Sequence, residues 1–425
     1  MAHVPLQKRP HDLFVSYGHA DFGRVDPIVQ WLKQFAGLKL WFDSTSGDAS
    51  KRTTALLTAA IESSRGAIFF LSSGWLGSTW CTDEHEVALN ERRKDDGFLV
   101  LAVRLDDCDL PSWFAISNVL DFREFTPRSC AALLKSLSPN RPTRFDAAQD
   151  IYLSTPWSRQ TEATKKAMRA IAAMGWRLVG DSPDHPDFSD SAARIASIIE
   201  TSRGLIAVLP FDSSKPPAFT SPYILDEIEI ALGLHESYLL LAEAGVKVPD
   251  DFVLNSFGQT VTLISNEMAA TDLQQVLNDF DEELLRKPFT DSRTYSFLAT
   301  SLLADPTEAD DLVSVMEHAS NMSCMQGRGF TGQHVQRAIT DRISRAAFVL
   351  ADVSENHRNS LIEAGIAMGA KTPLYLMSSI PGDGSRHRRF MFEAMEMNWY
   401  RNALERLGIT YRIAGLYKRR IYYPK

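Results

Sequence analysis

The chain has 425 residues, of which 44% are hydrophobic and 23% are charged, and its net charge at pH 7 is −8. This composition is typical of a water-soluble globular protein and argues against an intrinsically disordered chain. At roughly 150 residues per domain, the length allows two to four domains. No apolar run approaches the roughly 18 residues of a membrane-spanning helix, and no apolar signal-peptide core follows the N-terminal basic residues. We therefore expect a cytoplasmic protein with no membrane partner.

Cysteine spacing and net charge argue against further classes of protein. The four cysteines lie far apart and form no Cys-x-x-Cys pair, which indicates neither a disulfide framework nor a zinc site. The acidic net charge disfavours nucleic acid as a partner. Residues 385–425 differ, with ten Lys and Arg against three Glu. They form either a phosphate-binding tail or, as the interspersed acidic residues favour, a folded terminal helix with a solvated basic face and inward-packed aromatic side chains.

Strands and helices alternate through the N-terminal third of the chain. The pattern predicts a strand near 14–15, a helix over 27–35 with Pro27 in its opening turn, a strand over 38–42, a helix over 53–63, a strand over 67–71, a helix from about residue 80, and strands over 98–103 and 119–122. Such alternation with continuously apolar strands predicts a doubly wound parallel sheet covered by helices on both faces. Ligands bind such sheets beyond the carboxyl ends of the strands, where Ser16, Asp43 and Ser72 stand.

The same unit recurs further along the chain at one constant offset. Residues 12–16 match 150–154, residues 37–43 match 175–181, and residues 61–66 match 199–204. A fainter third copy includes residues 343–350, and every copy carries a Glu-x-x-x-Ala step, which begins at Glu84, Glu227 and Glu363. We therefore predict three tandem flavodoxin-like domains of the doubly wound α/β class, over residues 1–140, 148–288 and 291–425.

The first unit resembles a TIR domain. The resemblance rests, in the expected order, on residues 11–17 (HDLFVSY), 40–43 (LWFD), 64–65 (SR), 70–73 (FLSS) and 77–84 (GSTWCTDE). Its most specific element is the Trp80-x-x-x-Glu84 step, which in the family marks members that cleave NAD at the nicotinamide–ribose bond. The resemblance implies an NAD nucleosidase that needs no cofactor or metal. It also implies a bacterial antiphage effector that forms a homo-oligomer when assembly or a nucleotide-derived ligand activates it.

The residue types suit this chemistry. Cleavage of the N-glycosidic bond leaves positive charge on the ribose, which a fixed carboxylate such as Glu84 stabilises. The resemblance assigns substrate binding to Trp80, Asp43, Asp48, His19 and Tyr17. Structural alternatives stand beside these assignments: a helix-dipole role in a first turn for Glu84, a solvated loop acid for Asp48 and a surface imidazole for His19.

The later units diverge at these positions, because Tyr223 and Asn359 replace Trp80. Residues 351–369 are similar to the nucleoside 2-deoxyribosyltransferase-like group, in which the counterpart of Glu363 is a nucleophile. Candidate ligand-binding residues in these units are Asp181, Glu227, Asp352, Asn359 and Glu363. The structural alternatives are a Ser360–Glu363 capping box and a place for Glu227 just after the helix-capping Ser221 and Pro222.

Three functions follow, in order of preference. The first is a TIR NADase that hydrolyses or cyclises NAD through Glu84. The second is a non-catalytic nucleotide-sensing or scaffold protein for signalling. The third is a nucleoside N-glycosidase or deoxyribosyltransferase, which ranks last because residues 356–358 (NHR) lack the acid that assists the nucleophile in that group.

Overall fold

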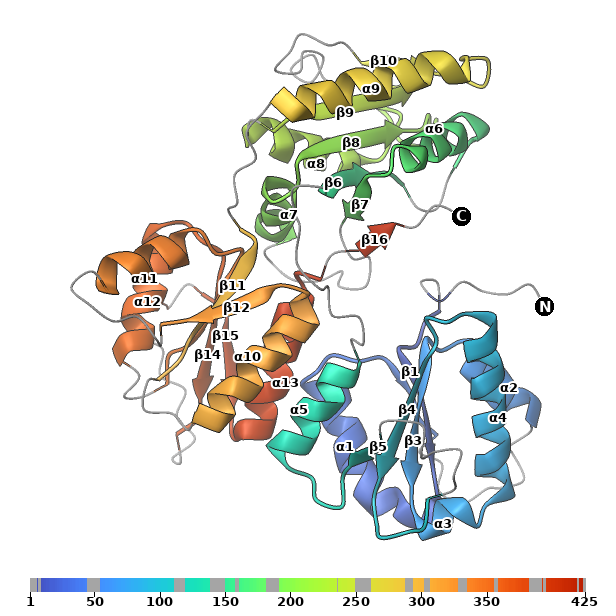
Figure 1. Ribbon diagram of the computed structural model, residues 1–425, viewed down its shortest axis with the longest axis vertical. Coiled ribbons are helices and arrows are strands. Elements are labelled where there is room, and N and C mark those ends of the chain that lie inside the picture. The colour runs from blue at the N-terminus through green and yellow to red at the C-terminus, as the bar shows by residue number, and fades with distance from the viewer. Residues whose placement is uncertain are drawn as a thin grey trace. The chain divides into compact units, whose positions relative to one another are not determined.

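Three parallel sheets flanked by helices make up the computed structural model (Figure 1). The structure describes residues 6, 9–43, 54–110, 119–137, 150–156, 160–180, 191–234, 236–248, 261–286, 293–301, 306–327, 335–354, 358–381, 392, 395–418 and 420–422. In each sheet the strands follow the flavodoxin-like order, second–first–third–fourth–fifth. The predicted fold class is confirmed. The domain boundaries, which fall largely outside the described residues, stay a prediction.

The first sheet has the order β2-β1-β3-β4-β5. Its domain consists of β1 (Leu13–Tyr17), η2 (His19–Asp21), α1 (Phe22–Gln34), β2 (Leu40–Trp41), α2 (Thr54–Glu62), β3 (Gly66–Leu71), α3 (Ser73–Leu76), α4 (Thr79–Lys94), β4 (Leu99–Arg104), β5 (Val119–Asp121) and α5 (Pro127–Ser136). The expected opening-turn position of Pro27 is wrong, because α1 begins at Phe22 and Pro27 lies in its second turn. The exposed Gly23 precedes Pro27 by four residues, so water can satisfy the carbonyl that proline leaves without a donor.

The second sheet has the order β10-β9-β8-β6-β7-β16. Its elements are β6 (Asp150–Ser154), α6 (Glu162–Ala173), β7 (Arg177–Gly180), α7 (Ser191–Glu200), β8 (Gly204–Leu209), α8 (Pro222–Gly233), β9 (Tyr238–Glu243), β10 (Thr262–Ile264) and α9 (Ala270–Arg286). The added strand β16 (Arg420–Tyr422) comes from a distant segment of the chain and pairs antiparallel with β7. It covers backbone groups that an edge strand would otherwise expose.

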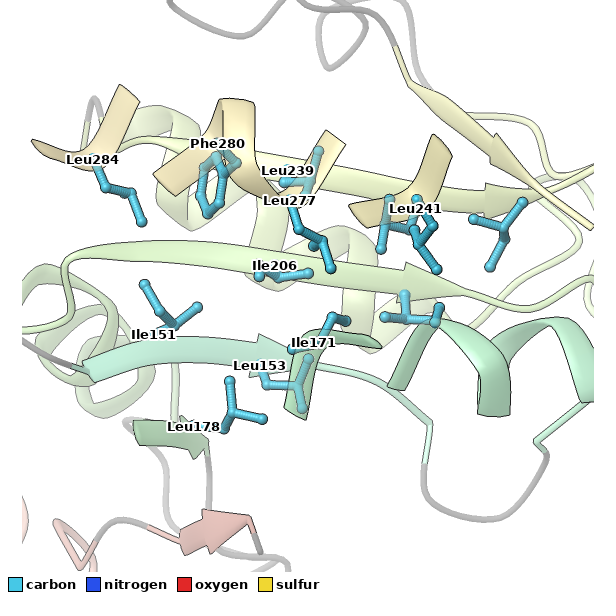
Figure 2. Packing of buried hydrophobic residues seen from close by; sticks show 14 residues of the cluster. Ile151, Leu153, Ile171, Leu178, Ile206, Leu239, Leu241, Leu277, Phe280 and Leu284 are labelled. Atoms are coloured by element: carbon cyan, nitrogen blue, oxygen red, sulfur yellow. The ribbon is translucent and has the colours of Figure 1, made fainter. Parts of the chain in front are cut away.

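Alternate residues of the strands build two cores in this domain. On one face, Ile151 and Leu153 of β6 pack with Ile171 of α6 and with Leu277 and Phe280 of α9 (Figure 2). On the other face, Tyr152 of β6 and its neighbouring strand residues pack against α7 and α8. The strands are therefore apolar on both sides, as a sheet buried between two helical layers requires.

The third sheet has the order β12-β11-β13-β14-β15. Its domain contains β11 (Tyr295–Ala299), α10 (Pro306–Ser320), β12 (Ser323–Gln326), α11 (Val335–Ser344), β13 (Val349–Asp352), α12 (Arg358–Gly369), β14 (Leu374–Ser379), β15 (Met397–Tyr400) and α13 (Ala403–Gly415). The folded terminal helix is confirmed as α13, and the buried Tyr417 stacks on Phe348 with ring centroids 4.1 Å apart. The basic face is not wholly solvated, because Arg406 is buried and pairs with Glu308.

A left-handed turn recurs between the first helix and the second strand of each domain. Gly37 and Gly175, which are equivalent in the repeat, have φ of 72° and 77°, and Asn321 has φ of 60°. Glycine and asparagine are the residues that adopt this conformation most readily. The chain thus reverses in the same way in all three domains, which supports the third copy independently of sequence similarity.

Replacement of Gly175 by alanine tests the cost of this turn. A Cβ at Gly175 would meet nothing within 4 Å, so only backbone strain opposes the change. We expect Gly175→Ala to lower the free energy of unfolding by about 1 kcal/mol. Gly233→Ala, at the last residue of α8, also meets nothing within 4 Å and should stabilise by about 0.5–1 kcal/mol. Melting temperatures measure both, and a rise with Gly175→Ala would contradict the account.

Candidate functional site

The loops after β1 and β3 meet at the carboxyl edge of the first sheet, where the strand order reverses. The Ser72 hydroxyl donates to the Asp21 carboxylate and accepts a hydrogen bond from the Trp75 backbone N–H at 3.0 Å. The Trp75 Nε1–H donates to Ser16 Oγ at 2.9 Å. Ser16 and Ser72 are therefore gathered at this edge as predicted, but both are buried and engaged in holding the loops together.

Gly18 allows the two loops to approach this closely. A Cβ at this position would lie 2.9 Å from Asp21 Oδ2 and 3.0 Å from the Trp75 backbone nitrogen. The second of these atoms belongs to the main chain and cannot move aside without shifting α3. The loop after β1 is thus packed tightly against the start of α3 and forms a rigid border of the site.

Tyr17 connects the two sides of the candidate site. Its hydroxyl donates to the Asp43 carbonyl oxygen at 2.8 Å, and its ring packs against Phe42 with centroids 5.2 Å apart. The Cys81 thiol points at the Tyr17 carbonyl oxygen at 3.8 Å. Asp43, two residues after the end of β2, and the start of α4 therefore lie on either side of Tyr17, which is itself buried.

Glu84 lies in the second turn of α4, as the sixth residue of a helix that begins at Thr79. Its side chain is only 8% exposed. The helix-dipole explanation for Glu84 is wrong, because that effect is confined to the first turn, which contains no acidic residue. Trp80 precedes Glu84 by one helical turn.

His85 follows Glu84 and was not singled out by the sequence. Burial lowers its pKa to about 4. Its ring lies edge-on to Phe69 with centroids 5.1 Å apart. His85 is therefore neutral at physiological pH and belongs to the core.

The remaining predicted site residues lie apart from the residues around Tyr17 and Glu84, or outside the part of the chain that the structure describes. His19 is exposed in η2, consistent with the surface imidazole. Asp48 and the Trp80 side chain lie outside the described residues. Among the side chains that the structure describes, no group of three or more His, Cys, Asp or Glu is arranged to hold a metal ion. The described helices also include none with the length and hydrophobicity to cross a membrane.

The comparison with known families finds a match within the first domain. Residues 13–135 match the TIR domain model. A solved structure, the TIR domain of the Toll-related receptor TRR-2 from Hydra magnipapillata, is 17% identical, with a match that covers 27% of this chain and 86% of that chain and a TM-score of 0.24. No curated protein matches. Residues 13–135 are called the TIR segment below.

In the second domain, two strand hydroxyls hold the glutamate equivalent to Glu84. Glu227 is the sixth residue of α8 and accepts hydrogen bonds from the hydroxyls of Tyr152, at 2.7 Å, and Ser154. Ser154 is the repeat equivalent of Ser16, whose oxygen in the TIR segment instead accepts a hydrogen bond from Trp75. Glu227 thus joins α8 to β6, and Asp181 lies outside the described residues.

In the third domain, Glu363 is again the sixth residue of its helix, α12. The predicted capping box is wrong, because α12 begins at Arg358 and Ser360 lies inside it, with a buried hydroxyl that has no hydrogen-bond partner among the described residues. The Glu363 carboxyl packs against Gly327, where a Cβ would come 2.4 Å from Oε1. Burial raises the pKa of Glu363 to about 7. Strand register places Phe297 where the other domains have Ser16 and Ser154, so β11 offers no hydroxyl there.

The other two candidates of the third domain differ in burial. Asp352 is fully buried at the end of β13 and accepts hydrogen bonds from the Ser354 N–H at 3.2 Å and from its hydroxyl at 2.6 Å. Asn359 is exposed at the second position of α12. Asp352 therefore shapes the loop after β13, and Asn359 faces solvent.

Sequence reasoning missed several residues that organise these sites. Asp21 and Trp75 were not identified, although Ser72 three residues before Trp75 is a recognisable helix-capping signal. Tyr152 was missed as the partner of Glu227, although Tyr152 and Ser154 alternate along β6 and so share one face of the sheet. These contacts join distant segments of the chain, so no local sequence pattern predicts them.

The pH dependence of stability should reveal the environment of Glu363. The unfolded chain ionises this group near its ordinary pKa of 4.5, whereas the folded protein keeps it protonated up to about pH 7. Its contribution to stability is therefore complete below pH 4.5 and falls as pH rises to 7, by about 3 kcal/mol.

We expect Glu363→Gln to raise the melting temperature at pH 8 but to change it little at pH 4. Asp310→Asn, at an exposed position of α10, serves as the control and should show no such difference. An equal effect of Glu363→Gln at both pH values would contradict the assignment.

Proposed function

We propose that the TIR segment is an NAD nucleosidase in which Glu84 is the catalytic carboxylate. The observation that carries the proposal is the place of Glu84: a buried acidic side chain, beyond the first turn of α4, in a helix anchored to the end of β1. The TIR domain match supports the same assignment. The proposal includes a homo-oligomeric effector of bacterial antiphage defence, activated by assembly or by a nucleotide-derived ligand.

The reaction needs a negative group beside the ribose. When the bond between C1′ and the nicotinamide nitrogen breaks, its electron pair leaves with neutral nicotinamide and positive charge develops on the ribose. A preorganised carboxylate stabilises that charge more than the ground state and so lowers the barrier. Water then adds to C1′ and loses a proton, or a nitrogen of the adenine adds instead and closes a ring.

Tyr17 and Asp43 have positioning and binding roles in this proposal. The hydrogen bond from Tyr17 to the Asp43 backbone fixes the end of β2 relative to β1. Asp43 is half-buried there, at the sheet edge where doubly wound folds bind ligands. Its carboxylate is proposed to accept hydrogen bonds from ribose hydroxyls, and Trp80 to pack against the nucleotide.

Glu84→Gln tests the proposal directly. The amide keeps the size of the side chain but removes its charge, so nicotinamide release from NAD should fall by at least about 100-fold. Asp83→Asn changes an exposed neighbour on the same helix and should retain activity. Release is measured over a wide range of protein concentration, and melting temperatures confirm that both variants fold. Full activity of Glu84→Gln would exclude the proposed role.

The second candidate is a non-catalytic nucleotide-binding protein. The observation that favours it is the environment of Glu227, whose carboxylate is bound to two strand hydroxyls and so serves the fold rather than catalysis. NAD that stays intact at high protein concentration, with nucleotides and crowding agents present, would favour this candidate. The N-glycosidase hypothesis is weaker, because residues 356–358 (NHR) lack the acid that assists the nucleophile in the similar group.

A further inference from the structure

A cavity of about 370 Å³ lies at the carboxyl edge of the second sheet. Its lining comes from the loop after β6, represented by Gln160 and Thr161, from the loop after β8, represented by Phe211 and Lys215, and from Ser221 at the start of α8. In the order β7-β6-β8, this is the point where the strand order reverses. The volume falls in the range of pockets that bind small molecules.

Ser221 at the start of α8 presents a polar group to the cavity. Ser221 is the N-cap residue of α8, but its side chain makes no capping hydrogen bond. By contrast, Thr161 at the start of α6 accepts a hydrogen bond from the Thr164 N–H at 3.1 Å. Pro222 at the first position of α8 has no N–H, and the Ile224 N–H donates to the Ser221 carbonyl oxygen at 3.2 Å, so the start of α8 offers an anion its helix dipole and the Ser221 hydroxyl. The neighbouring Thr220 hydroxyl is buried and has no hydrogen-bond partner among the described residues.

Lys215 adds a positive charge to the same cavity. Its side chain is exposed and takes part in no ion pair within the described part of the chain. Its backbone is fixed, because the Lys215 N–H donates to the Asp212 carbonyl at 3.1 Å and its own carbonyl accepts from the Phe219 N–H at 2.7 Å. An ammonium group and the start of a helix together form a binding site for a phosphate group.

Phe211 supplies an aromatic surface to the cavity lining. Its side chain is 42% exposed although it is supported from behind, where Gly245 leaves no room for a Cβ and Phe219 packs with centroids 5.7 Å apart. Its N–H donates to Glu243 Oε2 at 2.8 Å, which fixes the backbone. A held but exposed ring is suited to stacking on a planar heterocycle.

Asp212 also lines the cavity, together with Gln160, Pro156 and Pro210. The Asp212 carboxylate is buried and accepts hydrogen bonds from the Ser214 N–H at 3.0 Å and from its hydroxyl at 2.6 Å. A carboxylate beside the lysine disfavours a ligand that is anionic throughout, such as free phosphate. It favours a ligand that carries hydrogen-bond donors at one end and an anion at the other.

We propose that this cavity binds a nucleoside monophosphate. The phosphate interacts with Lys215, Ser221 and the start of α8, and the base stacks on Phe211. The site is separate from Glu227, whose carboxylate is bound to strand hydroxyls. The proposal does not depend on NAD cleavage by Glu84.

Calorimetric titration of the full-length Glu84→Gln variant with AMP tests the proposal without interference from catalysis. We expect saturable binding of AMP at millimolar concentration or below. Lys215→Gln should weaken AMP binding by about tenfold, as for loss of one charge-assisted hydrogen bond, and should leave adenosine binding unchanged. Phe211→Ala should weaken both ligands by about tenfold or more.

Lys247→Gln is the matched control. Lys247 belongs to the same domain and lies over the Phe219 ring at 5.4 Å, outside the cavity lining. Its replacement should leave AMP binding unchanged. Equal losses with Lys215→Gln and Lys247→Gln would overturn the site. Inorganic phosphate that binds as tightly as AMP, or no binding by AMP, GMP, CMP or UMP, would overturn the ligand class.

Discussion

The reversal of strand order in each sheet is the constraint on which the candidate sites depend. The loops after the first and third strands lie at the carboxyl edge of each sheet, at the point where the strand order reverses. The main helix between the third and fourth strands begins at this edge and carries a glutamate as its sixth residue in all three domains: Glu84 in α4, Glu227 in α8 and Glu363 in α12. One structural position therefore recurs three times with the same residue type.

The surroundings of the shared glutamate differ among the three domains. Ser154 donates to Glu227 and, with Tyr152, fixes it to β6. The equivalent Ser16 accepts a hydrogen bond from Trp75 and serves the loop packing around Asp21 instead. The third domain has Phe297 at this place, and its glutamate is a buried acid with a raised pKa. The three domains thus share the scaffold but differ in the contacts around this glutamate.

The sequence predicted the fold well, because its signals are local or periodic. Apolar strands, helical spacing and the constant offset between repeated segments led to three doubly wound domains, and the structure has them. Predictions that depended on where a helix begins were less successful: Pro27 lies a turn deeper than expected and Ser360 is not a cap. A few residues on either side of a helix start have similar propensities, so tertiary contacts decide the boundary. The partners of Glu227 and the network around Trp75 join segments that are far apart in the sequence, which no local pattern reveals.

The second domain depends on strand β16, which lies outside the chain segment that forms the rest of that domain. Residues 420–422 form the outermost strand of a sheet whose other five strands lie between residues 150 and 264. During synthesis the second sheet therefore leaves the ribosome with one edge uncovered, and the whole third domain is made before that edge can be closed. A chain interrupted anywhere before residue 420 would leave the β7 edge of the second sheet unpaired. The second sheet is therefore complete only in chains that also contain the third domain.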